Sequence, residues 1–146
     1  MRYAIDQNIK DLRSRSRKYK THTKRLKEIK ENYPYLFDAR YLTRMAVDIK
    51  TYAKAKMHTD FMKFEIQMLT ENIESVDNDF ELIRVNLGED AYIMLRENFI
   101  EKMNWDEIAR KHNISRRTLS RKQRAWAARY SELIENRRVS DNVSNG

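Results

Sequence analysis

Residues 104–124 of the chain have the sequence NWDEIARKHNISRRTLSRKQR, which predicts two helices joined by a tight turn. Asn104 is a favoured N-cap residue, and Asp106 and Glu107 follow in the first turn, where acidic side chains stabilise the helix dipole. Apolar residues at helical spacing indicate that one face of this first helix packs on the rest of the protein. These residues are Trp105, Ile108 and Ala109.

The second helix of this stretch is basic along one side. Asn113 tolerates the left-handed conformation that a tight turn needs, and Ser115 is a favoured N-cap for the helix that follows. Residues 116–129 contain no acidic residue, and such a uniformly cationic face favours an anionic partner. The core side is predicted to carry Leu119, Trp126, Tyr130 and Leu133. The opposite side is predicted to carry Arg116, Arg117, Ser120, Arg121 and Arg124.

Residues 87–133 resemble the fourth-region domain of bacterial sigma factors and its relatives among phage regulators. The pattern is a Ser or Asn cap, the sequence E-I-A, a short turn, then I-S-x-x-T followed by Val or Leu and a basic helix. The matching residues are Asn104, Trp105, Glu107, Ile108, Ala109, Ile114, Ser115, Thr118 and Leu119. The chain departs at Asn113, where the family commonly has glycine. Its length and the C-terminal position of this stretch are similar to phage late-gene regulators of the RinA and ArpU type.

The resemblance implies an all-α, sequence-specific double-stranded DNA-binding regulator of transcription, an activator of phage or mobile-element origin. The helix that starts at Ser115 is expected to enter the major groove, and RNA polymerase is an expected partner. The residues implied to contact base edges are Arg116, Arg117, Ser120 and Arg121. The residues implied to contact phosphates are Ser115, Thr118, Lys122 and Arg124.

Composition argues against several other classes of protein. The 146 residues include two Gly, one Pro and no Cys, which favours nearly continuous helix and offers no disulfide or thiolate metal site. The histidines His22, His58 and His112 are far apart in sequence, and no glycine-rich phosphate loop is present. We therefore expect no enzyme activity, no metal and no cofactor. The lack of an apolar span or secretory signal leads us to expect a cytoplasmic location in a bacterial host, with no membrane partner.

The net charge of +8 is distributed unevenly along the chain. Residues 10–30 hold ten Lys or Arg and two acids, whereas residues 31–101 hold eight Lys or Arg and fourteen acids. The N-terminal block is predicted to be either a long helix or a flexible basic arm that becomes ordered on nucleic acid. Its candidate residues for a second nucleic-acid contact are Arg13, Arg15, Arg17, Lys18, Lys20, Lys24 and Arg25.

Pro34 and Gly88 suggest the main divisions of the chain. We expect a basic N-terminal helix or arm over 1–33, a helical middle region over 34–86, a helix-turn-helix domain over 87–136 and a disordered tail over 137–146. Within the middle region, Asp77-Asn-Asp79 is expected to interrupt the helix. An apolar stripe is expected to form core, with a dimer surface left open as an added role. Its residues are Phe61, Phe64, Met68, Ile73, Val76, Phe80, Ile83 and Leu87.

Two alternatives remain from the sequence. A DNA-packaging component similar to a phage small terminase subunit also combines a helix-turn-helix with an oligomerising helical part, and it would assemble as a ring of many subunits. A helical protein-interaction module would use its basic ends on acidic protein surfaces and would show no preference for a DNA sequence. A measured mass and a DNA selection experiment separate these alternatives from a transcriptional regulator.

Overall fold

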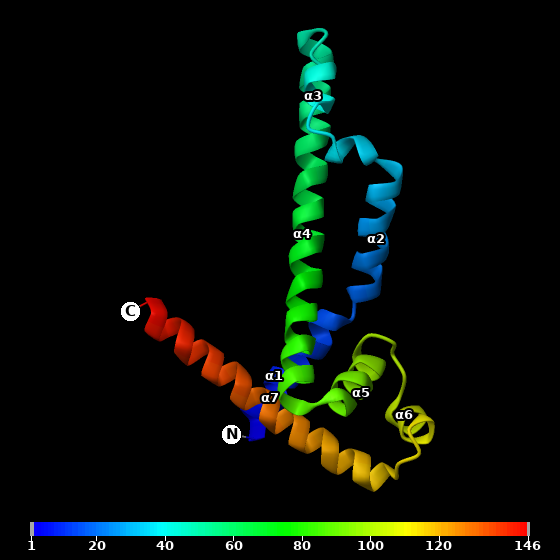
Figure 1. The fold of residues 1–146 in the computed structure, drawn as a ribbon, viewed down its shortest axis with the longest axis vertical. Helices are drawn as coiled ribbons and strands as arrows, with labels where there is room; N and C mark the ends of the chain where they lie inside the picture. Colours follow the sequence, from blue (N-terminus) through cyan, green and yellow to red (C-terminus); the bar gives the residue numbers. More distant parts are fainter. Residues whose placement is uncertain (1, 146) are drawn as a thin grey trace. The chain divides into compact units, whose positions relative to one another are not determined.

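The computed structural model describes the backbone of residues 2–145 and the side chains of residues 7–141. Over this range every regular element is a helix, which confirms the all-α prediction (Figure 1). The elements in chain order are α1 (Arg2–Ser16), α2 (Tyr19–Asn32), the 3₁₀ helix η1 (Pro34–Phe37), α3 (Tyr41–Arg44), α4 (Ile49–Leu87), α5 (Glu89–Phe99), α6 (Trp105–Lys111) and α7 (Arg116–Asn145).

The helices form two compact units. The first contains α1, the end of α4 from Val76 onward, and α5 to α7; the second is Tyr19–Ser75, with α2, η1, α3 and most of α4. This division differs from the expected boundaries, because the basic N-terminal block is split between the units. Leu12 of α1 is fully buried in the first unit, and Ile29 of α2 is fully buried in the second. Each unit therefore takes its own part of the block into its core.

The Tyr19–Ser75 unit is built by packing α2 and η1 against one face of α4. Its buried side chains are Ile29, Leu36, Met62 and Leu69, with Leu26, Tyr33, Tyr35 and Ile66 packed around them. An ion pair joins the two helices, since Arg25 Nε lies 2.5 Å from Glu65 Oε1. Pro34 begins η1, where its fixed φ suits the first residue of a helix, and this is the chain break that the sequence predicted.

The apolar residues of α4 lie on two different faces, so the expectation of one continuous core stripe is wrong. Val76, Phe80 and Ile83 are buried, but Phe61, Phe64 and Met68 are exposed. At 100° per residue, the two groups point in different directions around the helix axis. The buried seam of α4 instead repeats every seven residues, through Ala55, Met62, Leu69, Val76 and Ile83.

Helix α4 runs without interruption through Asp77-Asn-Asp79, which corrects the expected break there. The side chain of Asp79 is buried within the first unit and forms an ion pair with Arg15. Its carboxylate therefore does not act as a helix cap. The helix ends one residue before Gly88, whose φ of 100° suits only glycine. The sequence therefore located this end correctly and misplaced the interruption.

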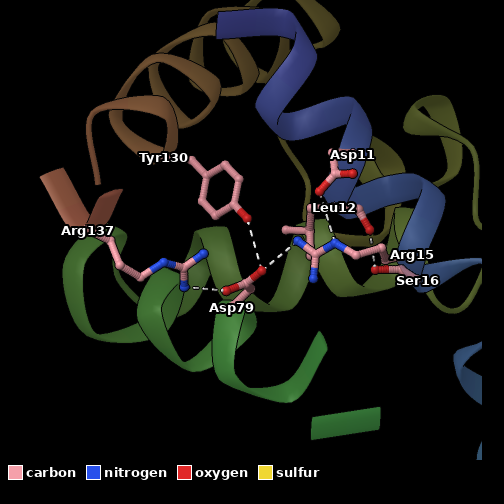
Figure 2. A network of polar contacts seen from close by, with 7 residues as sticks. All are labelled: Asp11, Leu12, Arg15, Ser16, Asp79, Tyr130 and Arg137. Carbon is pink, nitrogen blue, oxygen red and sulfur yellow. Dashed lines mark hydrogen bonds and ion pairs between the residues drawn. The ribbon is translucent and has the colours of Figure 1, made fainter. Parts of the chain in front are cut away.

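Asp79 is the centre of a polar network that joins three helices of the first unit (Figure 2). Its Oδ2 accepts hydrogen bonds from Arg15 Nη2 of α1 at 2.6 Å and from the Tyr130 hydroxyl of α7 at 3.3 Å, and its Oδ1 accepts one from Arg137 Nη1 of α7 at 2.9 Å. Burial, with the neighbouring Asp79 charge, raises the pKa of Tyr130. A second contact between α1 and α7 runs from Asn8 Nδ2 to Ser131 Oγ at 3.2 Å.

The expected disordered tail is helical as far as the structure describes it. Helix α7 extends to Asn145, so residues 137–145 belong to it, and Gly146 lies outside the described residues. No glycine or proline interrupts this part of the sequence, and Arg137 is held by Asp79. The ion pair between Glu135 and Arg138, at 3.2 Å, is a further i,i+3 contact that favours helix.

We predict that Asp79→Asn lowers the free energy of unfolding by about 1–3 kcal/mol, because it removes the charge that Arg15 and Arg137 share. Asp60→Asn is the matched control, since it also removes one carboxylate but only from a surface ion pair with Lys56. Denaturant unfolding followed by circular dichroism measures both variants. An equal loss of unfolding free energy in the two variants would show that the buried Asp79 carboxylate stabilises the fold no more than a surface carboxylate does.

Candidate nucleic-acid interface

Helix α6 begins with the N-cap that the sequence predicted. Asn104 Oδ1 accepts a hydrogen bond from the backbone N–H of Glu107 at 2.8 Å, and its Nδ2 donates to Glu107 Oε1 at 2.6 Å. The first bond satisfies one backbone donor that the helix itself leaves open, and the second joins the two side chains. Ile108 and Ala109 are buried as expected, and Trp105 is only half-buried. The first of the two predicted helices is therefore capped and packed.

The turn between α6 and α7 depends on Asn113, which adopts a left-handed φ of 54°. The backbone N–H of Ile114 then donates to the carbonyl of Ala109 at 3.0 Å. Ser115 caps α7, because its Oγ accepts from the backbone N–H of Thr118 at 3.1 Å and lies 2.9 Å from the Thr118 hydroxyl. The hydroxyls of Ser115 and Thr118 take part in this cap, and their expected phosphate contacts stay a prediction.

Three arginines form the exposed side of the first turns of α7. Arg117, Arg121 and Arg124 are exposed at i, i+4 and i+7, and no ion pair to these three is found among the residues that the structure describes. The opposite side of α7 is buried, through Leu119, Trp126, Tyr130 and Ile134. Leu133, expected in the core, is half-buried beside Ile134. We call Arg117, Arg121 and Arg124 the arginine face.

The remaining predicted contact residues are less available than the arginine face. Arg116 is exposed, but its Nε lies 2.6 Å from Asp106 Oδ1 of α6. This ion pair connects the starts of the two helices, which sequence spacing did not reveal. Ser120 and Lys122 are half-buried along the sides of α7. Arg124, expected to hold a phosphate, is exposed and shares one face with Arg117 and Arg121, as the sequence predicted.

A buried carboxylate fixes the end of α6 against α5. Glu97 is buried, and both Lys111 Nζ and His112 Nε2 lie 2.5 Å from its oxygens. Burial acts to raise the pKa of Glu97, but the hydrogen bonds from Lys111 and His112 outweigh it and hold the pKa below its usual value. His112 thus helps to position the turn. Glu97 is distant in sequence from Lys111 and His112, so the local sequence does not indicate that these side chains meet.

The expected second nucleic-acid contact is only partly available. Arg15 is bound to Asp79 and Arg25 to Glu65, so both arginines have structural roles. The Arg13 guanidinium lies 5.7 Å from the centre of the Phe99 ring. The other four candidates are exposed and divide between the two units: Arg17, Lys18, Lys20 and Lys24.

A metal cluster and a membrane-spanning helix are not found in the described part of the chain. Within it, no three His, Asp or Glu side chains gather as they would around a metal ion. None of the helices described over residues 2–145 combines the length and apolar character needed to span a bilayer. The arginine face and its supporting turn are therefore the candidate site that the geometry offers.

We predict that Glu97→Gln destabilises the first unit at pH 7 by about 1–3 kcal/mol, because Lys111 and His112 lose an ionised partner. The folded-state pKa of Glu97 is lowered, so its contribution is present above the unfolded value of about 4.3 and is lost as the pH falls through the folded value. Melting curves of parent and variant should differ at pH 7, and the difference should shrink as the pH falls below the unfolded value and through the folded one. Glu135→Gln, which alters only a surface ion pair, is the control.

Comparison with known proteins finds no match to this chain among family models, curated proteins or solved structures. The resemblance to sigma-factor domains rests on the residues of the motif in residues 104–119.

Proposed function

We propose that this protein is a sequence-specific double-stranded DNA-binding regulator that places the N-terminal turns of α7 in the major groove. The observation that carries the proposal is the arginine face, which is exposed and lies opposite a fully packed core side. The left-handed turn at Asn113 and the cap at Ser115 support it by fixing where α7 begins. A rigid helix start is what a base-reading helix needs.

The dimensions of the arginine face suit a groove. An α-helix with its side chains is about 10–12 Å across, and the major groove is about 12 Å wide, so it admits α7 with Arg117 and Arg124 about 10 Å apart along the helix. An arginine can donate two hydrogen bonds to guanine, which gives it the means to discriminate among base pairs. The middle residue, Arg121, has the central position for base contact, and the outer two can reach bases or the flanking phosphates.

The charges around the arginine face favour an anionic partner, as DNA is. Residues 116–129 of α7 hold no acid, and the nearest acidic partner, Asp106, is paired with Arg116. Unneutralised cations on one helix face repel each other until phosphates bind between them. The regulatory part of the proposal, including contact with RNA polymerase, rests on the resemblance in sequence alone.

The test of this function begins with selection of bound duplexes from a random DNA pool. The selected duplex should bind about a thousandfold more tightly than scrambled DNA at physiological salt. Weak binding that is equal on every duplex and falls steeply with salt would contradict a sequence reader. A mass of many subunits arranged as a ring would instead favour a DNA-packaging component.

We predict that Arg117→Ala and Arg121→Ala each weaken discrimination at particular base pairs by about 1–3 kcal/mol. Arg138→Ala removes the same charge about 30 Å farther along α7 and should change binding little. Titration against single-base variants of the selected duplex measures the effect. Losses that are uniform across all sequences would assign these arginines to phosphates, and parent-like binding by both variants would exclude the arginine face.

A further inference from the structure

Helix α4 carries an exposed apolar stripe within the Tyr19–Ser75 unit. Its four side chains are large and largely open to solvent: Met57 (76% exposed), Phe61 (68%), Phe64 (65%) and Met68 (46%). Their spacing of four, three and four residues places them on one face of the helix. Two phenylalanines and two methionines in one solvent-facing row indicate a surface that binds another apolar surface.

The unit's own core does not use this stripe. Helix α2 and η1 pack on a different face of α4, where Met62 and Leu69 are buried. At 100° per residue, Met62 and Leu69 lie about 80–160° around the helix axis from Phe61 and Phe64. The stripe is therefore a second apolar face on a helix whose first face is already covered.

The charges at the two ends of the stripe are opposite. Lys50 and Lys54 continue the row before Met57, and Glu71 continues it after Met68. All three are exposed, and no ion pair to Lys54 or Glu71 occurs among the described residues. A row with cations at one end and an acid at the other is complementary to a copy of itself turned end to end.

We propose that the protein dimerises through this stripe, with α4 of a second copy packed antiparallel about a two-fold axis between Phe61 and Phe64. Such an interface is isologous, so every pair occurs twice. Phe61 then faces Phe64 of the partner subunit, Met57 faces Met68 of the partner subunit, and Lys54 faces Glu71 of the partner subunit. One register thus matches both the apolar residues and the charges.

A parallel pairing lacks this match. It would set Lys54 beside Lys54 of the partner subunit and Glu71 beside Glu71 of the partner subunit, and like charges at seam positions oppose association. The antiparallel seam from Lys54 to Glu71 is about 26 Å long, which is roughly two and a half heptads. This inference concerns the Tyr19–Ser75 unit and does not depend on DNA binding.

The first test is the mass of the full-length chain in solution, without DNA, over a range of concentrations. The parent should be a dimer, and Phe61→Glu with Phe64→Glu should raise its dissociation constant at least about a hundredfold, because charges replace two buried rings. Val47→Glu places one such charge on a comparably exposed apolar residue outside the stripe and should leave the dimer intact. The proposal would be overturned if the parent is monomeric at all concentrations. It would also be overturned if the protein with Phe61→Glu and Phe64→Glu is as dimeric as the Val47→Glu control.

The second test determines the direction of pairing, and the chain helps because it contains no native cysteine. Lys54→Cys and Glu71→Cys are prepared as separate variants and treated with a short bis-maleimide. The mixture should form a covalent dimer, and each variant alone should form little. Cross-linking of Lys54→Cys with itself would indicate a parallel dimer and contradict the antiparallel register.

A charge exchange provides an independent check on folded protein. Lys54→Glu alone and Glu71→Lys alone should each weaken the dimer, because each places like charges opposite one another. The double exchange should restore parent-like association. A double variant as weak as the single variants would exclude the Lys54 to Glu71 pairing. Circular dichroism of each variant shows whether it keeps the parent's helix content.

Discussion

The first unit depends on a buried carboxylate, Asp79, that is shared among three helices. An ionised carboxylate that is removed from water destabilises the fold unless charged partners and hydrogen bonds satisfy it. Arg15 and Arg137 supply the charge, and the Tyr130 hydroxyl supplies a further hydrogen bond (Figure 2). These partners come from α1 and α7, so satisfying Asp79 requires both helices to be docked on α4. One side chain thereby couples parts of the chain that are far apart in sequence.

The same arrangement recurs nearer the candidate interface. Glu97 of α5 is buried and holds Lys111 and His112 at the end of α6, just before the turn at Asn113. With Tyr130 held by Asp79 at one end and the turn held by Glu97 at the other, the intervening part of α7 has a fixed core side. The arginine face is the exposed side of α7, and neither Asp79 nor Glu97 binds its three arginines.

Helix α4 shows how one long helix can have two different apolar faces. The face that includes Met62 and Leu69 builds the core of the Tyr19–Ser75 unit, and the face that includes Phe61 and Phe64 is exposed. Because the two ends of the second face carry opposite charges, a second copy of the chain is a suitable partner for it. A two-fold protein presents two copies of any DNA-reading helix, which is compatible with the proposed function without being required by it.

The local sequence determined the helical class, the caps at Asn104 and Ser115, the left-handed turn at Asn113 and the end of α4 before Gly88, because caps, turns and glycine act over a few residues. It could not assign the partners of Asp79 and Glu97, because those pairs form only when distant helices meet. For the same reason it placed Phe61 in a core and Arg15 on a nucleic acid. Spacing defines the face of a helix, and tertiary packing decides which face is covered and which cations remain exposed.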